Sequence, residues 1–402
     1  MEEMITMERA RELILERIKP FEEVEYVMLP NALGRILAEN QVAKIDNPPF
    51  DRAPVDGYAC KGADLAGASP DCPVCLRVLE EIDAGQYSEV QVKSGEAVRI
   101  MTGAAIPPGC DCCVRQEVTD CGEATVQVYE PVQAGDNYCY AGEDYKKGTF
   151  LLEKGTHITY VEAGILASMG CRKVPVMRRP RIALFTTGDE VVSPGEVLLP
   201  GKIYNSNGTM LEFRLKELGM APTEVDTVKD DPEALAKRIR DVSGHVDLIV
   251  TTGGVSVGKK DIVHDAVKLL DAEKVFWRIK MKPGTPVVFS VYDNVPVISL
   301  SGNPFAALVN FELLVRPALG ALTGNEFLNP VWTKAVMADP FPKESKGRRL
   351  IRGILRDGKV YLNSGLHSSG CISTMRNCNC MVDICPGTEL LQPGDVVSVI
   401  IL

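Results

Sequence analysis

Residues 247–261 read Asp-Leu-Ile-Val-Thr-Thr-Gly-Gly-Val-Ser-Val-Gly-Lys-Lys-Asp, an apolar run followed by a glycine-rich loop and an acid. The run over 247–252 has the length and composition of a buried strand, and helical periodicity resumes over 262–270. An apolar strand that passes through glycines into a helix is typical of layered α/β proteins. This stretch therefore predicts one strand–loop–helix unit of such a domain.

The same alternation continues on both sides of this unit. Strands are predicted over 181–186, 222–228, 275–279 and 295–300, with helices over 208–218, after the cap Asp231 with Pro232 in first position, and from Pro304. Strands that alternate with helices of this length indicate a parallel or mostly parallel sheet covered on both faces. We expect this α/β domain to begin near Arg179.

The flanking sequence has a different texture. Residues 6–19 carry helical periodicity behind a predicted cap at Thr6, and a second helical pattern covers 158–166. Between them, residues 45–143 form short β-type runs separated by Pro/Gly turns, and residues 331–402 alternate apolar and polar positions. The pattern predicts a leading amphipathic helix, a mostly β insert and a small all-β domain at the C-terminal end.

Composition limits the function classes. The 402 residues carry a formal net charge of −10 and no basic stripe, so nucleic acid is not an expected partner. No apolar run approaches about 18 residues and the N-terminus is acidic, so we expect neither a membrane span nor export. The 13 cysteines are odd in number, so reduced thiols and a cytoplasmic location are predicted.

Acidic residues follow three of the predicted strands. Thr187, Gly188 and Glu190 come after the first, Asp230 after the second, and Asp261 ends the glycine-rich loop after the third. Because ligands of open α/β sheets bind at the carboxyl ends of the strands, we expect these groups to converge. Converging carboxylates repel unless a cation such as Mg²⁺ joins them to a phosphate-bearing ligand. Helix capping explains Asp231 equally well, and it is a second explanation for Asp261.

Glycines and later strand ends extend this candidate site. A backbone without Cβ can approach a phosphate closely, which favours Gly253, Gly254 and Gly258 as contacts, together with Ser256 in the same loop. Lys282 lies in the stretch Lys-Met-Lys-Pro-Gly-Thr-Pro over 280–286 and has no obvious local partner. The helix start at Ser301, Asn303 and Pro304 offers free N–H groups, although a capped, proline-started helix explains these residues as well.

Two other chemistries fit fragments of the sequence. Residues 254–258 match the G-x-S-x-G pattern of hydrolases, but the helix begins too late and the one base in the right order is His367, in the all-β domain. Cysteine pairs suggest zinc, although the second group lacks the usual spacing and unpaired thiols explain it as well. The cysteines concerned are Cys72, Cys75, Cys110, Cys112 and Cys113, and at the C-terminal end Cys371, Cys378, Cys380 and Cys385.

The ordered motifs resemble those of the MoeA-type molybdopterin molybdenumtransferases, which are related to the gephyrin E domain. Eight of them occur in order across the chain: PPFDRAPVDGYA, VRIMTGAAIP, AGEDYKKG, FTTGDE, VKDDPEAL, TTGGVSVGKKD, KMKPGTP and SGNP. The resemblance implies an elongated helical dimerisation segment (1–45 and 145–179), a β-rich insert (46–144), a molybdopterin-binding α/β domain (180–325) and a C-terminal β-barrel (326–402). It also implies a homodimer and possible contact with the upstream adenylyltransferase.

The resemblance further implies insertion of molybdate into adenylyl-molybdopterin with Mg²⁺ and release of AMP. Carried onto this sequence, Glu190, Asp230 and Asp261 become Mg²⁺ or phosphate-site residues, and Lys282 and the glycines of 253–258 become pterin-phosphate contacts. The partner subunit would add a second wall, formed by Asp56, Thr102 and Asp144. The alternatives are a molybdopterin adenylyltransferase and a non-catalytic pterin-binding scaffold, and the sequence does not separate molybdate from tungstate.

This chain departs from the family pattern at three places. Cys139, Tyr140 and Ala141 stand where arginines are usual, Thr285 replaces a usual lysine, and Ser301 replaces a proline. Two of these changes remove positive charge from a site for anions, which costs on the order of 1.5–3 kcal/mol per lost contact. We expect Lys259 and Lys260 to compensate. Replacing both with alanine should weaken molybdate uptake, and unchanged uptake would exclude that role.

Overall fold

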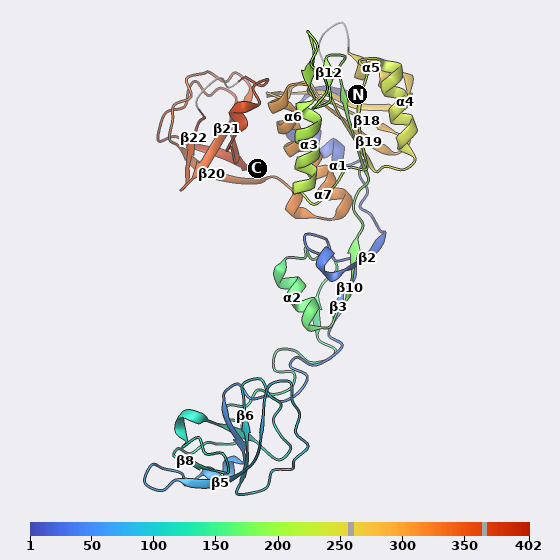
Figure 1. The fold of residues 1–402 in the computed structure, drawn as a ribbon. Helices are drawn as coiled ribbons and strands as arrows, with labels where there is room; N and C mark the ends of the chain where they lie inside the picture. Colours follow the sequence, from blue (N-terminus) through green and yellow to red (C-terminus); the bar gives the residue numbers. More distant parts are fainter. Residues whose placement is uncertain (256–260, 364–367) are drawn as a thin grey trace. The chain divides into compact units, whose positions relative to one another are not determined.

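The computed structural model describes residues 1–255, 261–363 and 368–402 (Figure 1). Two compact units make up the chain. Unit 1 comprises Met1–Tyr26, Gly34–Ala38 and Pro175–Leu402, and unit 2 comprises Val27–Leu33 and Glu39–Val174. β2 (Val24–Met28) and β10 (Lys173–Met177) pair in a short two-stranded sheet.

A seven-stranded sheet forms the centre of unit 1. Its order is β1 (Glu2–Ile5), β16 (Glu273–Ile279), β18 (Val288–Tyr292), β19 (Val295–Leu300), β15 (Leu248–Thr252), β11 (Ile182–Thr187) and β14 (Glu224–Val228). Every strand runs in the same direction except β18, which is antiparallel to both neighbours. The predicted mostly parallel sheet is therefore confirmed, and the sequence pattern revealed neither β18 nor the edge strand β1.

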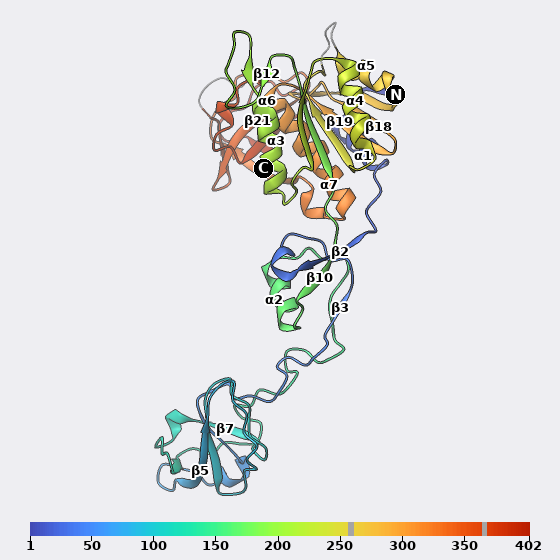
Figure 2. The ribbon, with the colours of Figure 1, turned by 45° about the vertical axis from the view of Figure 1, so that its right-hand side comes forward.

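Helices cover both faces of this sheet (Figure 2). One face packs α3 (Ser206–Glu217), α6 (Pro304–Asn310) and α7 (Arg316–Thr323) against buried residues such as Leu184 and Val250. The other packs α4 (Pro232–Ser243) and α5 (Ile262–Leu269) against residues such as Phe185 and Ile249. Because neighbouring strand residues point to opposite faces, the central strands are apolar throughout.

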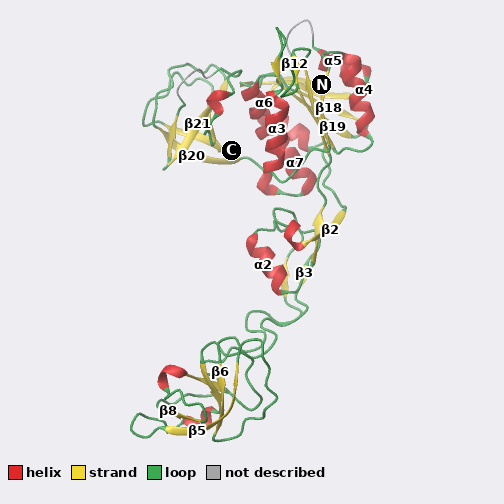
Figure 3. Cartoon of the chain, viewed as in Figure 1, coloured by secondary structure: helices red, strands yellow, loops and turns green. Residues whose placement is uncertain are grey.

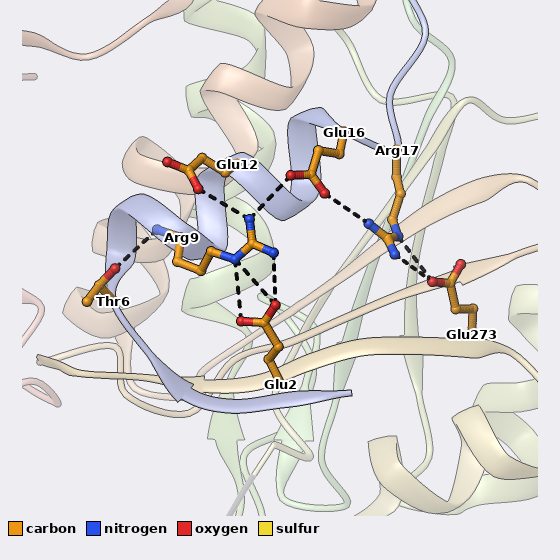
Figure 4. Close-up of polar contacts among 7 residues, drawn as sticks. All are labelled: Glu2, Thr6, Arg9, Glu12, Glu16, Arg17 and Glu273. Atoms are coloured by element: carbon orange, nitrogen blue, oxygen red, sulfur yellow. Dashed lines mark hydrogen bonds and ion pairs between the residues drawn. The ribbon is translucent and has the colours of Figure 1, made fainter.

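The N-terminal residues join this sheet. β1 pairs in parallel with β16, and α1 (Met7–Leu15) begins after Thr6, whose hydroxyl accepts the N–H of Arg9 at 3.2 Å as predicted. Arg9 also pairs with Glu2 at 2.9 Å and with Glu12 and Glu16, each at 3.3 Å (Figure 4). Residues 2–15 thus belong to unit 1, whereas the family resemblance assigns 1–45 to an elongated segment. β1 has four residues with two acids, so no periodicity marks it.

One long buried helix lies on the face of the sheet that also packs α3. α6, a π-helical turn over Phe311–Val315 and α7 follow one another without a break from Pro304 to Thr323. By length and composition this helix could span a membrane, which corrects the expectation that no apolar run is long enough, but 89% of it is buried inside the protein. That burial is typical of the core helix of a soluble domain. Its charged residues are Glu312 and Arg316; Glu312 is fully buried and pairs with Arg316 at 2.6 Å and with Arg214 on α3 at 2.7 Å.

The C-terminal residues form a closed β-barrel, as expected. The sheet order is β17 (Met281–Lys282), β21 (Arg348–Arg356), β22 (Lys359–Tyr361), β20 (Val331–Met337), β24 (Val396–Ile401) and β23 (Cys380–Ile384), and pairing of β21 with β23 closes it. The barrel has its own apolar core, which includes Val360, Val382 and Val399. Closure removes the exposed edges of an open sheet.

Unit 2 consists largely of strands and loops (Figure 3). Its main sheet has the order β7 (Cys112–Arg115), β4 (Gly57–Cys60), β6 (Glu96–Ile100), β5 (Val74–Ile82) and β8 (Thr125–Val128). A smaller sheet pairs β3 (Gln41–Val42) with β9 (Phe150–Leu152). The helix α2 (Tyr160–Ser168) starts at a capping box of Thr159 and Glu162. The predicted mostly β insert and the helix near 158–166 are both present.

Candidate functional site

A cavity of about 670 Å³ lies at the carboxyl ends of the central strands. Its walls come from the loops after β11, β14, β15 and β19 and from the start of α3. This is the edge at which open α/β sheets bind ligands. Nine predicted site residues line it: Thr187, Gly188, Glu190, Asp230, Gly253, Gly254, Ser301, Asn303 and Pro304. Ser256 and Gly258 lie outside the described residues.

Two glycines after β15 are required by close packing. Gly253 has φ +96°, and a Cβ there would lie 2.3 Å from the carbonyl oxygen of Thr187. Gly254 has φ +64°, and a Cβ there would lie 2.4 Å from the Cγ1 of Ile262. Any larger residue would push the two strand exits apart. Both glycines also line the cavity, and glycine backbone of this kind is what phosphate-binding loops use.

Two carboxylates face the same cavity. Glu190 follows β11 and Asp230 follows β14, and both line the wall. The two loops are connected, because the backbone N–H of Asp230 donates to the Oδ1 of Asp189 at 3.2 Å. Lys202 in turn donates to the carbonyl oxygen of Asp189 at 2.5 Å. Mg²⁺ in phosphate sites uses one or two carboxylates plus phosphate oxygens and water, so Glu190 and Asp230 fit such an ion.

Asp261 occupies a different position from these two acids. It is the N-cap of α5, where its Oδ1 accepts the backbone N–H of His264 at 3.2 Å, and it is not part of the cavity wall. Burial raises the pKa of Asp261 to about 6. Within residues 1–255, 261–363 and 368–402 no group of three or more acidic, cysteine or histidine side chains could hold a metal ion. The structure thus brings Glu190 and Asp230 together and leaves Asp261 apart from them. Asp231 caps α4 as predicted, accepting from Ala234 at 2.8 Å.

Buried polar groups in the same wall were missed by sequence reasoning. Asn207, in the first turn of α3, donates to the hydroxyl of Thr252 at 3.2 Å and to the carbonyl oxygen of Gly302 at 2.8 Å. Its own Oδ1, and the Oγ1 of Thr187, are buried without a hydrogen-bond partner among the described residues. Unpaired buried polar atoms in a cavity wall are groups that a polar ligand or water can satisfy. The sequence feature that could have indicated these polar groups is the Asn-Ser-Asn run over 205–207.

A second cavity of about 640 Å³ adjoins the first and shares Pro286, Ser301 and Asn303 with it. Three cations line it: Lys282, which was predicted, and Lys343 and Arg349, which were not. Arg349 donates to the hydroxyl of Ser345 at 2.9 Å and to the carbonyl oxygen of Glu344 at 3.1 Å, so these partners leave its charge unneutralised. No acidic side chain occurs among the described residues of this lining.

A buried arginine holds a chain segment that contributes residues to both cavities. Arg352 on β21 is 1% exposed and donates to the carbonyl oxygens of Cys371 at 2.9 Å and Ser368 at 2.6 Å. Its guanidinium lies 4.4 Å from the ring centre of Phe305 in α6. The segment that it holds supplies Ser368 to the second cavity and residues 370 and 372 to the first. Arg352 is therefore a positioning residue for both walls.

Unit 2 contains the remaining predicted site residues. The Oδ1 of Asp56 accepts the backbone N–H of Thr102 at 2.7 Å and its hydroxyl at 2.6 Å, and these hydrogen bonds lower the pKa of Asp56. Asp144 accepts the side-chain amide of Asn47 at 2.8 Å. The pair Asp56 and Thr102 is thus brought together within unit 2, and Asp144 is fixed by a neighbouring loop.

The zinc hypothesis finds no support among the described residues. Cys72 and Cys75 are exposed whereas Cys110, Cys112 and Cys113 are buried. Among the described residues, neither these cysteines nor those at the C-terminal end belong to a group that could hold a metal ion. All thirteen cysteines are free thiols. Ser256 and His367 of the hydrolase hypothesis lie outside the described residues, as do Lys259 and Lys260.

Models of three protein families match successive parts of the chain. They are "MoeA N-terminal region (domain I and II)" over residues 5–170, "Probable molybdopterin binding domain" over 183–321 and "MoeA C-terminal region (domain IV)" over 334–402. A protein of Bacillus subtilis named molybdopterin molybdenumtransferase is 35% identical over 387 residues, which cover 94% of this chain and 90% of that protein. One of Staphylococcus aureus with the same name is 35% identical over 378 residues, 93% of this chain and 90% of that protein.

Solved structures agree with the sequence comparison. A crystal structure of a MoeA molybdopterin biosynthesis protein from Pyrococcus horikoshii matches with a TM-score of 0.84 and 31% identity, over 99% of both chains. A second structure of a MoeA protein from this organism matches with a TM-score of 0.81 and 29% identity, over 99% of this chain and 100% of that one. Matches of this length include the strand-end cavity, the barrel and unit 2. The chain therefore belongs to the MoeA family of molybdenum cofactor biosynthesis, the family of the molybdopterin molybdenumtransferases.

Proposed function

We propose that this transferase inserts molybdate into adenylyl-molybdopterin in a Mg²⁺-dependent reaction that releases AMP. The observation that carries the proposal is the pair of adjoining cavities at the strand ends. One has bare glycine backbone and two carboxylates, and the other has three cations and no acid among its described lining residues. The first suits a phosphate-linked nucleotide with a divalent cation, and the second suits an oxyanion.

In the first cavity, the backbone of Gly253 and Gly254 would approach the phosphates, with the N–H of Gly254 as the donor, because the N–H of Gly253 donates to the carbonyl oxygen of Leu300 at 3.2 Å and that of Phe305 at the start of α6 donates to the carbonyl oxygen of Ser369 at 3.0 Å. Helix N-termini and glycine turns direct unpaired N–H groups toward anions. Glu190 and Asp230 would hold Mg²⁺, which supplies charge neutralisation at the phosphoanhydride when it is bound. The unpaired Thr187 and Asn207 oxygens would orient the ligand by hydrogen bonds. Positioning and charge stabilisation, rather than proton transfer by a side chain, then dominate the step.

In the second cavity, Lys282, Lys343 and Arg349 would hold the molybdate dianion. The shared wall of Ser301 and Asn303 places the two ligands next to each other. Thr285, the position at which a family lysine is missing, lies in this lining, and its hydroxyl donates to the carbonyl oxygen of Met281. Lys343 and Arg349 therefore supply positive charge that position 285 lacks. Tungstate has the same shape and charge, so the same cavity would accept it.

We further propose that the enzyme acts as a homodimer in the cytoplasm. Unit 2 carries exposed apolar side chains, among them Tyr160, Phe150 and Val161, which are surfaces that a second copy can cover. Asp56, Thr102 and Asp144 would then contribute to the site of the partner copy. The thirteen free thiols suit a reducing compartment.

The direct test incubates purified protein with adenylyl-molybdopterin, Mg²⁺ and molybdate and follows AMP release. We expect AMP and metal-containing pterin in equal amounts. Adenylylation of molybdopterin from ATP would instead indicate an adenylyltransferase, and tight ligand binding without AMP would indicate a scaffold. EDTA should stop the reaction and added Mg²⁺ should restore it, whereas full turnover in EDTA would contradict the metal dependence.

A further inference from the structure

A lysine–histidine–aspartate contact lies at the point where the glycine-rich segment enters α5. The Nδ1 of His264, in the first turn of α5, lies 3.0 Å from the Nζ of Lys274 on β16. Its Nε2 lies 3.4 Å from the Oδ2 of Asp261, the cap of the same helix. The side chains of His264 and Asp261 are 18% and 13% exposed. This contact is separate from the residues that line the cavity.

The chemistry of the three groups fixes the state of the ring. An ammonium group has only donors, so the Nδ1 that faces Lys274 must be an acceptor and the neutral ring must carry its hydrogen on Nε2. That hydrogen faces Asp261. Neither the Nε2 of His264 nor the Oδ2 of Asp261 has another hydrogen-bond partner among the described residues. At 3.4 Å the contact is long for a hydrogen bond, but each atom is the polar group that the other has available.

The ring is held in place by an aromatic neighbour. His264 meets Trp277 edge to face, with 4.5 Å between ring centres and an interplanar angle of 86°. The guanidinium of Arg278 lies 3.9 Å from the ring centre of Trp277. With Trp277 on one side and Lys274 at Nδ1, a flip of the imidazole would break the contact with Lys274. The carboxylate of Asp261 is then fixed at both oxygens, by the His264 ring and by the His264 backbone N–H.

The first turn of α5, which Asp261 caps, packs against a residue of the cavity wall. Ile262, the next residue, packs so closely on Gly254 that a Cβ on Gly254 would lie 2.4 Å from it, and the N–H of Val263 donates to the carbonyl oxygen of Gly254 at 3.5 Å. Gly254 lines the cavity. A shift of the first turn of α5 therefore moves the backbone that we assign to the phosphates.

We propose that Lys274 and His264 are positioning residues that lock the Asp261 cap and thereby set the Gly253–Gly254 wall of the nucleotide cavity. The link to ligand binding rests on the proposed function, whereas the tautomer of His264 does not. Lys274 thus acts on the site through His264 without touching a ligand.

The test combines ¹⁵N NMR of the imidazole with calorimetric binding of AMP in the presence of Mg²⁺. The full-length protein should show the Nε2–H tautomer of His264, and Lys274→Met should lose that preference and raise the Kd for AMP roughly tenfold, below the ~100-fold cost of a 1 Å misplacement. Lys274→Arg, which keeps a donor, should restore both. Lys268→Met, on the exposed side of α5, is the matched control and should change neither.

Each outcome decides a separate part of this proposal. A dominant Nδ1–H tautomer of His264, or an unchanged tautomer in Lys274→Met, would show that Lys274 does not position His264 against Asp261. An altered tautomer with unchanged AMP affinity would overturn the coupling to the cavity. Failure of the unaltered protein to bind AMP would count against the proposed function, while the NMR measurement would still decide the lock.

Discussion

Gly253 shows how far a single residue constrains the site. Its positive φ and the 2.3 Å approach to the Thr187 carbonyl oxygen exclude any side chain. We expect Gly253→Ala to abolish measurable AMP binding and to lower stability by about 2 kcal/mol, because the β11 and β15 exits must separate. Gly244→Ala at the end of α4, where φ is −71° and no atom lies within 4 Å, is the control for calorimetry and should bind normally. Normal AMP binding by Gly253→Ala would contradict the assignment of this backbone to the phosphates.

Lys343 is the residue that most directly tests the oxyanion cavity. A charged hydrogen bond contributes about 1.5–3 kcal/mol, so Lys343→Met should raise the Kd for molybdate about tenfold or more. The exposed Lys334 on β20 lies in none of the cavities described above, and Lys334→Met should leave molybdate binding unchanged. Equal losses in the two variants would indicate a general effect of charge rather than a site.

Local and non-local residues differed in how well the sequence predicted them. The caps Thr6 and Asp231 and the glycines after β15 follow from neighbours in sequence, so their positions were predictable. Lys343 and Arg349 lie beside Lys282 only because β17 joins the barrel sheet next to β21, where Lys282 pairs with Arg349, and no local pattern encodes that pairing. Asp261 was placed with Glu190 and Asp230 from strand order, but the same residue is the helix cap, and the capping geometry takes it away from the wall.

At the scale of elements, an aspartate anchors the start of β15 to the start of β11. Asp247 accepts from Arg178 at 2.7 Å and from Arg181 at 2.9 Å, and it is 10% exposed. Although burial opposes ionisation, the two arginines lower its pKa to about 2. A carboxyl with a lowered folded-state pKa stabilises the fold above its unfolded pKa of about 3.9 and stops doing so as pH falls through the folded value.

Asp247→Asn should therefore lower the free energy of unfolding by about 2 kcal/mol at pH 7. The difference from the unaltered protein should shrink as the pH falls from about 4 to about 2, because the carboxyl then becomes protonated in both states. Urea denaturation at several pH values measures this difference. A constant difference down to pH 2 would show that the ion pairs are not its cause.

A buried ion cluster stabilises the long helix over Pro304–Thr323. Glu312 is fully buried between Arg214 and Arg316, so Glu312→Gln leaves two cations without their carboxylate and should cost about 3–5 kcal/mol of stability. Glu217→Gln removes the exposed partner of the same Arg214 and should cost less than about 1 kcal/mol. Thermal denaturation of the two variants checks the contrast, and similar losses would contradict a dominant role for burial.

At the scale of the whole molecule, one cavity is positively charged although the chain as a whole is negative. The chain carries −10 overall, yet Lys282, Lys343 and Arg349 surround one cavity that has no acid in its described lining. A local positive region of this kind raises the concentration of an anion that the rest of the surface repels. The barrel contributes Lys343 and Arg349 and the α/β sheet contributes the glycines and acids, so the two folds together form the paired cavities.

The most direct measurement is a crystal structure of the protein soaked with AMP, Mg²⁺ and molybdate, with molybdenum located by its anomalous scattering. The account predicts an AMP phosphate against the backbone of Gly253 and Gly254, and a molybdenum peak among Lys282, Lys343 and Arg349. Molybdenum bound only at other sites, or AMP away from the strand ends, would contradict the two-cavity assignment.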